Sequence, residues 1–247
     1  MIAKSLKREI EFLLKPLASE ADSGKASEKI GQSSPMIFVT GPRQVGKTYQ
    51  TKLISKAYYN WDTSEVKKAF LKDPYFFRTG APWVIFDEIH KRRDWKKLLK
   101  GYFDSPNRTE NFIVTGSGRF NLYQKGGDSL QGRYDLLHLY PITLDEYTSN
   151  CGPLRARNFE TWEPTSNNKN SQEKELIKLG GFPEPLLRGT ETHLNKWLDL
   201  YLQRLIEEDI RDFSKGELVD KIELLARLLP GRVGSPLSFQ SLSEDVE

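Results

Sequence analysis

The stretch GPRQVGKT, residues 41–48, is the feature that most constrains this chain, and it directly follows the apolar run MIFVT. It has the spacing of a glycine, four variable residues and then Gly-Lys-Thr. In a loop of this spacing the backbone N–H groups wrap a phosphate, and the glycines allow dihedral angles and close approaches that a side chain would block. The pattern therefore predicts a phosphate-binding loop between a strand and a helix.

The loop supplies the candidate nucleotide-binding residues. We expect Lys47 to reach the β- and γ-phosphates of ATP, and Thr48 to bind Mg²⁺ through its hydroxyl. The alternative is a glycine-rich turn with an exposed lysine; the apolar strand before the loop and the helix after it favour the phosphate site. The full candidate set is Gly41, Pro42, Arg43, Gln44, Val45, Gly46, Lys47, Thr48 and Tyr49.

Two adjacent acids follow the apolar run WVIF, at Asp87 and Glu88. Ligands of open α/β sheets bind at the carboxyl ends of the strands. We expect Asp87 to hold Mg²⁺ through its water shell and Glu88 to act as the general base that polarises the attacking water. Two acids at a strand end are often a solvated turn, but the phosphate loop upstream favours the catalytic interpretation.

Two further candidates have weaker patterns. The run FIVTGS ends in small hydroxyl residues, so Thr115 or Ser117 could sense the γ-phosphate, although the same letters suit an ordinary strand-to-turn transition. Arg133 precedes the last apolar run and either acts as an arginine finger in a neighbouring subunit or makes a surface ion pair. The basic stretch 90–93 is interpreted as the solvated start of a helix rather than as a nucleic-acid site, with His90 as a surface or loop residue rather than a catalyst.

Short apolar runs alternate with helical patterns from residue 36 to residue 139, which predicts a parallel sheet covered on both faces. The fold class expected is therefore α/β, a P-loop NTPase core with a central five-stranded parallel sheet flanked by helices, followed by a small helical domain. We expect an N-terminal helix and flexible loop over 1–34, the core over 35–150, a polar linker or insertion over 151–175 and a helical segment over 176–229. The expected strands are Met36–Thr40, Tyr58–Trp61, Trp83–Phe86, Phe112–Thr115 and Tyr134–Leu139.

Composition sets few limits beyond these. The chain has 247 residues, a formal net charge of +3 and one cysteine, Cys151, which excludes an internal disulfide and any multi-cysteine metal site. A charge this mild does not by itself indicate a nucleic-acid partner. No apolar run reaches the roughly 18 residues that span a bilayer, so we expect no membrane partner and a cytoplasmic location.

The order of motifs GPRQVGKT, FDEIHK, FIVTGSGRF, SLQGRYDLLHLYPITLDEY, GGFPEPLL and YLQRLIEEDIRDF resembles AAA-superfamily ATPases of bacteria and archaea. Those proteins carry an ATPase core, a helical segment and a C-terminal domain of unknown function, and the likeness covers about residues 5–242. The resemblance implies ATP and Mg²⁺ binding by residues 41–48, metal and water handling by Asp87 and Glu88, a sensor at Ser117 and an arginine at Arg133. It also implies that residues 230–247 open a winged-helix domain, so we expect the chain to be truncated.

Three functions compete at this point. The leading hypothesis is a Mg²⁺-dependent ATPase that acts as a nucleotide-dependent switch, with ATP or ADP as its ligand and a homo-oligomer formed if Arg133 works in trans. The second is a P-loop phosphotransferase acting on a small molecule. The third is a nucleotide-regulated module that binds DNA, which the mild net charge supports only weakly.

Overall fold

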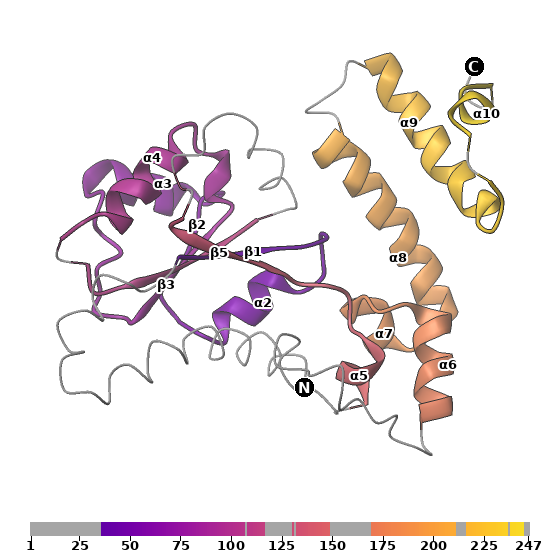
Figure 1. Cartoon of the computed structure of the whole chain (residues 1–247), viewed down its shortest axis with the longest axis horizontal. Coiled ribbons are helices and arrows are strands. Elements are labelled where there is room, and N and C mark those ends of the chain that lie inside the picture. Colours follow the sequence, from indigo (N-terminus) through magenta and orange to yellow (C-terminus); the bar gives the residue numbers. More distant parts are fainter. Residues whose placement is uncertain are drawn as a thin grey trace. The chain divides into compact units, whose positions relative to one another are not determined.

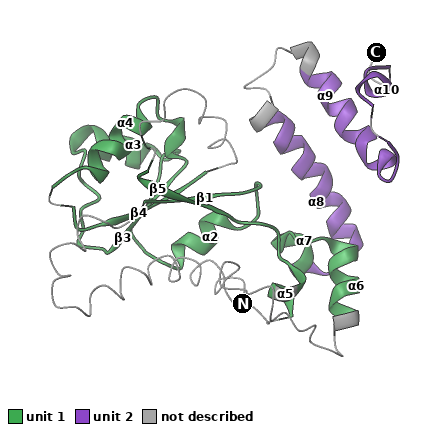
Figure 2. Ribbon diagram, viewed as in Figure 1, with its two compact units in different colours: residues 1–186 green, residues 187–247 purple. Residues whose placement is uncertain are grey.

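The computed structural model of the chain is shown in Figure 1, and it describes residues 36–106, 108–116, 130, 132–148, 169–210, 216–236 and 238–244. The chain divides into two compact units, residues 1–186 and residues 187–247 (Figure 2). The expected helix and loop over residues 1–34 and most of the expected linker lie outside the described residues. Each unit is described in turn.

A parallel sheet of five strands forms the centre of the first unit (Figure 1). Each strand begins and ends within one residue of its predicted bounds, and every neighbouring pair is parallel. The predicted α/β fold class is thereby confirmed. In the spatial order β2-β3-β4-β1-β5, the strands are Tyr58–Asn60, Trp83–Asp87, Asn111–Thr115, Met36–Thr40 and Tyr134–His138.

Both faces of the sheet are buried, which explains why its strands are apolar runs rather than alternating patterns. Along β1, Met36 and Phe38 face one core cluster, and Ile37 and Val39 face the other. Helices α3 (Ser64–Lys72) and α4 (Trp95–Phe103) lie on the first face, and α2 (Lys47–Lys52) lies on the second (Figure 1). The result is a three-layer arrangement in which the sheet holds the loop of residues 41–46 at its edge.

The strand order brings three chain ends together. Because β4 lies between β1 and β3, Thr115 at the end of β4 pairs with Val39 on one side and with Asp87 on the other. The loop that follows β1 and the acids that end β3 therefore emerge from the same carboxyl edge of the sheet. This adjacency positions the candidate site.

Among the described residues, three more helices follow the sheet of the first unit. They are α5 (Leu144–Tyr147), α6 (Lys169–Leu179) and α7 (Pro183–Arg188), the last of which crosses the boundary between the units. Helix α5 begins with a capping box, in which Thr143 and Glu146 satisfy each other's backbone N–H groups. Helix α6 begins at Lys169, so the last part of the range expected to be a linker is helical.

The second unit is helical. Helix α8 (Glu191–Arg204) is capped by Thr190 and continues into the π-helical turn η6 (Leu205–Ile210). It is followed by α9 (Gly216–Leu228), the 3-10 turn η7 (Leu229–Arg232) and α10 (Phe239–Glu244). Across the described parts of both units, every helix is too short or too polar to span a lipid bilayer.

Aromatic packing on one face of the sheet gives the first testable prediction. The ring of Phe77 is 1% exposed, and its centroid lies 4.7 Å from that of Tyr102, 5.3 Å from Phe86 and 5.9 Å from Phe112. Removing it leaves a cavity into which the surrounding side chains relax only in part, so Phe77→Ala should lower the free energy of unfolding by about 3 to 5 kcal/mol. Urea denaturation measures this, and Leu71→Ala, whose side chain is 84% exposed, is the matched control with little expected change.

Candidate nucleotide-binding site

Gly41 makes the first turn of the loop directly after β1. Its φ is +149°, and a Cβ built on it would overlap the carbonyl of Leu139, which follows β5. The chain at Leu139 is held there because its N–H donates to the carbonyl of Thr40, at 2.8 Å. Only glycine allows the loop to leave β1 so close to the neighbouring chain.

The middle of the loop adopts left-handed conformations at two positions. Gln44 has a φ of 60° and Gly46 a φ of 100°, and α2 begins immediately afterwards at Lys47. Right- and left-handed residues in succession turn backbone N–H groups toward a common point, which is the geometry of an anion-binding nest. The backbone therefore has the shape expected of a phosphate cradle.

The side chain of Lys47 folds back along this loop. Its Nζ donates to the carbonyl oxygens of Pro42, at 2.7 Å, and Gly41, at 2.9 Å, and the residue is 9% exposed. A buried ammonium needs such partners because leaving water is costly for a charge. The alternative of an exposed lysine on a glycine-rich turn is therefore wrong, since the positive charge lies at the loop itself.

Asp87 accepts hydrogen bonds from three different elements of the site. The residue is 4% exposed, and its carboxylate accepts three hydroxyl hydrogen bonds. Thr48 Oγ1 donates to Oδ2 at 2.9 Å, Tyr58 donates to the same oxygen at 2.5 Å, and Thr115 Oγ1 donates to Oδ1 at 2.5 Å. The structure therefore brings the hydroxyl of the loop and the first acid of β3 into direct contact.

These groups fit a magnesium ion that is held jointly with a nucleotide. Mg²⁺ prefers hard oxygen ligands and is commonly bound by one or two carboxylates, substrate phosphates and several waters. Thr48 and Asp87 supply one hydroxyl and one carboxylate at 2.9 Å from each other. The described residues contain no group of three or more His, Cys, Asp or Glu side chains that could hold a metal ion without a ligand's help.

Glu88 follows Asp87 in a left-handed conformation, with φ 56° and ψ 20°. A non-glycine residue in this conformation is uncommon, and such residues cluster at functional sites. The Glu88 carboxylate lies 3.5 Å from His90 Nε2 and 3.6 Å from Lys91 Nζ. Burial raises the pKa of Glu88, and the positive charges of Lys91 and Arg43 oppose that rise.

The basic stretch after the acids does not lie as predicted. His90 was expected to be a surface or loop residue; it lies in the short 3-10 turn after β3, and its side chain is 3% exposed and lies 3.5 Å from the Glu88 carboxylate. Lys91 bonds to Asp62 at 2.6 Å, and helix α4 begins only at Trp95. The turn that Glu88 starts brings these two basic residues back toward the acid, which the linear spacing of the letters did not reveal.

Of the two residues considered as a γ-phosphate sensor, the structure describes only Thr115. Ser117 lies outside the described residues. Thr115, the other residue considered for this role, is fully buried at the end of β4 and bonds to Asp87. In the described part of the site, the hydroxyl of β4 thus contacts the acid of β3.

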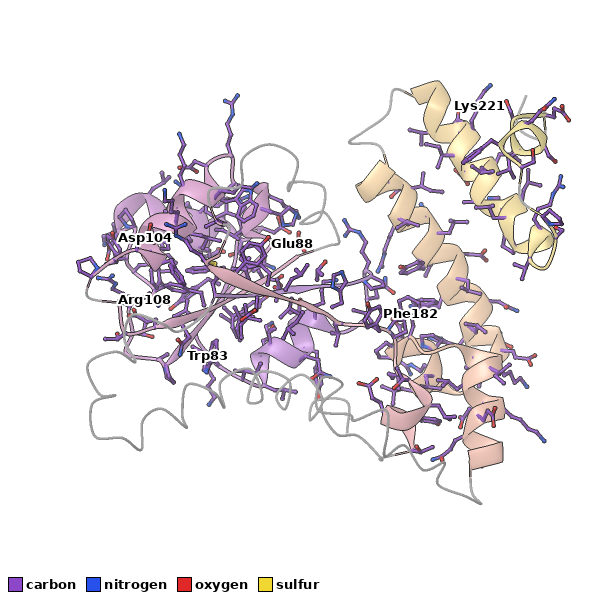
Figure 3. The ribbon with its side chains drawn as sticks, viewed as in Figure 1. Trp83, Glu88, Asp104, Arg108, Phe182 and Lys221 are labelled. Atoms are coloured by element: carbon purple, nitrogen blue, oxygen red, sulfur yellow. The ribbon has the colours of Figure 1, made fainter. Side chains whose placement is uncertain are left out.

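Arg133 lies away from this cluster. It precedes β5, so it stands at the amino end of the sheet, about 16 Å from the carboxyl edge at roughly 3.3 Å per residue. Its guanidinium makes a two-pronged contact with Asp104, at 2.8 and 3.1 Å. Figure 3 shows Asp104 and Glu88 on opposite sides of the core. Of the two roles considered for Arg133, a surface ion pair and an arginine finger, the structure of this chain contains the ion pair.

The loop's other candidate residues differ in exposure. Val45 is buried, whereas Tyr49 on α2 is 65% exposed. Arg43 is partly buried, and its positive charge opposes the rise in the pKa of Glu88 that burial causes.

Sequence reasoning assigned no role to the GGFP segment that comes before α7. The carbonyl of Gly181 accepts a hydrogen bond from Ile142 N–H at 2.7 Å, and a Cβ on Gly181 would lie 2.5 Å from the Ile142 oxygen. The Pro183 ring lies 3.9 Å from the Cβ position of Gly46. The paired glycines before a proline were the available signal, since such glycines permit close backbone approach.

Comparison with known families agrees with this geometry. Residues 33–148 match the family described as AAA domain. Together with the loop and the sheet, this match supports an AAA-type P-loop domain over these residues. Residues 170–247 match a second family, described as a domain of unknown function (DUF8612).

Curated relatives of the chain are longer proteins. It is 24% identical over 198 residues to uncharacterized proteins of Mycobacterium bovis and Mycobacterium tuberculosis, covering 78% of this chain and 40% of theirs. It is also 24% identical over 181 residues to an uncharacterized protein of Methanocaldococcus jannaschii, covering 66% of this chain and 37% of that one. The chain therefore spans about 40% of the length of these relatives.

Two solved structures resemble the chain at 15% identity. One is a Signal Transduction ATPase with Numerous Domains (STAND) protein with a tetratricopeptide repeat sensor from Pyrococcus horikoshii, at a TM-score of 0.39 over 87% of this chain and 35% of the other. The second is the Aeropyrum pernix ORC2 protein in its ADP form, at a TM-score of 0.41 over 96% of this chain and 83% of the other.

The first turn of the loop can be tested through its glycine. Gly41→Ala should destabilise the P-loop domain by more than about 1 kcal/mol, because the new methyl group meets the Leu139 carbonyl and the backbone keeps a positive φ. Thermal unfolding measures the change. Gly101→Ala on α4 is the control, since a Cβ there meets no atom within 4 Å and alanine favours a helix. Equal melting temperatures for the two variants would contradict the close approach.

Proposed function

We propose that this chain binds ATP together with Mg²⁺ and hydrolyses it, and that the bound nucleotide acts as a conformational switch. The observation that carries the proposal is the hydrogen bond between Thr48 and Asp87, at 2.9 Å. It joins the hydroxyl that ends the phosphate loop to the acid that ends β3. The AAA-domain match over residues 33–148 supports the same nucleotide class.

Each residue has a defined part in this proposal. The Lys47 ammonium exchanges the carbonyl oxygens of Gly41 and Pro42 for β- and γ-phosphate oxygens, which are stronger acceptors because they carry charge. Thr48 and Asp87 hold the cation through one hydroxyl and one carboxylate. When bound, Mg²⁺ supplies positive charge that neutralises the phosphate oxygens.

Glu88 is the proposed general base. Its carboxylate accepts a proton from the attacking water as the bond to the γ-phosphorus forms, and ADP leaves with inorganic phosphate as the second product. His90 and Lys91, at 3.5 and 3.6 Å, restrain this carboxylate. The raised pKa of Glu88 makes it a better proton acceptor than an ordinary surface glutamate.

Contacts inside the first unit support a switch. The Pro183 ring lies beside Gly46 of the loop, and Pro183 is also the first residue of α7, which leads directly into the second unit. A change in the loop on nucleotide binding is therefore transmitted to the start of the helical segment through one contact. We propose this coupling as the route by which nucleotide state reaches the second unit.

Oligomerisation belongs to the same proposal. Arg133 could complete a neighbouring subunit's site only after leaving Asp104. A monomer would then bind ATP well and turn it over slowly, since P-loop proteins without their arginine finger lose roughly 10³- to 10⁵-fold in rate. Product analysis separates the ATPase from the phosphotransferase, because free phosphate without any acceptor supports the ATPase. Salt-dependent binding to duplex DNA would instead support the DNA-binding module.

ATP binding should depend on the loop lysine. Lys47→Ala removes the charge that meets the phosphates, and a hydrogen bond to a charged group contributes about 1.5 to 3 kcal/mol, so affinity should fall roughly 10- to 150-fold. Isothermal titration of Mg²⁺-ATP into both proteins measures the change. Lys97→Ala, on the exposed face of α4, should bind as the parent chain does. Unchanged affinity in Lys47→Ala would contradict the proposed function.

Hydrolysis should depend on Glu88 and on pH. Glu88→Gln should retain ATP binding and lose about 10²- to 10⁴-fold in rate, because an amide cannot accept the proton. Since the pKa of Glu88 is raised in the free protein, the fraction of ionised base grows as pH rises through that value, and the acidic limb of kcat/KM should lie above the range of an ordinary glutamate. Phosphate release measured between pH 4 and 8 tests both expectations, and an unchanged rate in the variant would exclude Glu88 as the base.

A further inference from the structure

Tyr58 joins the site from a strand to which the proposed function assigns nothing. It begins β2 and pairs with Ile85 of β3, two residues before Asp87. Residues i and i+2 of a strand share a face, so Tyr58, Ile85 and Asp87 lie on the same side of the sheet. The phenol is long enough to reach along this face, and its hydroxyl bonds to Asp87 Oδ2 at 2.5 Å.

The ring of Tyr58 is held in place from α2. Lys52, the last residue of that helix, places its Nζ 4.1 Å from the ring centroid. The same helix carries Thr48, whose hydroxyl bonds to the same carboxylate oxygen as Tyr58 does. Tyr58 thus links both ends of α2 to the end of β3.

We propose that Tyr58 is a positioning residue that sets the affinity of the site for Mg²⁺ by fixing the Asp87 carboxylate. This inference rests on the proposed function and deepens it. Tyr58 acts through Asp87 rather than by touching the cation, the nucleotide or the attacking water.

The acceptor positions of Asp87 explain why a third hydroxyl matters. A carboxylate has about four lone-pair positions. Two on Oδ2 are used by Thr48 and Tyr58, and one on Oδ1 is used by Thr115. The three donors come from three elements, so they fix the rotation of the carboxylate. Among the described residues, their hydrogen bonds leave acceptor capacity on Oδ1. Loss of one donor lets the carboxylate rotate, so the remaining acceptor position on Oδ1 no longer points in one fixed direction.

Partners of this kind affect metal binding more than their distance from the ion suggests. Changing a residue that orients a metal-binding carboxylate commonly costs 10- to 100-fold in metal affinity. A role confined to packing would have a different signature, because phenylalanine keeps the ring, its place on the sheet face and its contact with Lys52. Only the hydroxyl distinguishes the two side chains.

The test compares the parent chain with Tyr58→Phe by fluorescence titration of an N-methylanthraniloyl ATP analogue. The probe is titrated first in EDTA and then at rising Mg²⁺. In EDTA both proteins should bind the analogue equally. The Mg²⁺ concentration that gives half of the cation-dependent gain in affinity should be at least 10-fold higher for Tyr58→Phe. Tyr59→Phe is the matched control, since that ring lies in the opposite core cluster, 4.8 Å from Phe76, and its Mg²⁺ dependence should be unchanged.

Each other outcome overturns the inference. An unchanged or lower Mg²⁺ requirement in Tyr58→Phe would show that the hydroxyl does not fix Asp87 for the cation. Equal loss of affinity in EDTA and in Mg²⁺ would show a general structural role. Those results leave binding by the parent chain intact, so the proposed function stands. Failure of the parent chain itself to bind the analogue with Mg²⁺ would overturn both.

Discussion

The carboxylate of Asp87 is a buried charge at the point where three parallel strands end, and the geometry of the site depends on how that charge is satisfied. A buried anion is costly unless hydrogen bonds replace the water it has lost. Here the replacements are hydroxyls from α2, β2 and β4, donated by Thr48, Tyr58 and Thr115. The same bonds that make the burial tolerable also tie the phosphate loop to the sheet. The three hydrogen bonds that compensate the burial of Asp87 are therefore also the contacts that shape the proposed cation site.

Around the loop, glycines permit close packing of the backbone, and basic side chains contact backbone carbonyls or acidic side chains. Gly41 lets the chain leave β1 against the Leu139 carbonyl, and Lys47 returns to the carbonyls of that same loop. Glu88 adopts a left-handed backbone that turns its carboxylate toward His90 and Lys91. Uncommon backbone conformations thus gather at the carboxyl edge of the sheet, where a ligand is expected, while the strands behind them are regular.

Much of the fold could be predicted because apolar runs and helical periodicity are local signals. The strands were located to within one residue, and motif spacing alone singled out Thr48 and Asp87, which the structure brings into contact at 2.9 Å. The same reasoning did not predict that His90 is buried, because the turn that follows Glu88 places the His90 side chain against the Glu88 carboxylate. Arg133 could not be resolved either, because its partner Asp104 lies 29 residues earlier in the chain.

By itself, the sequence determined the α/β class and predicted the loop at residues 41–48 and the acids after the third strand as a candidate site, because each depends on residue type and on spacing within one element and its flanks. Only the tertiary structure decided which hydroxyls meet Asp87. That choice follows from the strand order, which places β4 between β1 and β3 and β2 at the outer side of β3. Strand order depends on pairing between segments far apart in the chain. The local sequence around Tyr58 or Thr115 therefore does not indicate which strands will be neighbours.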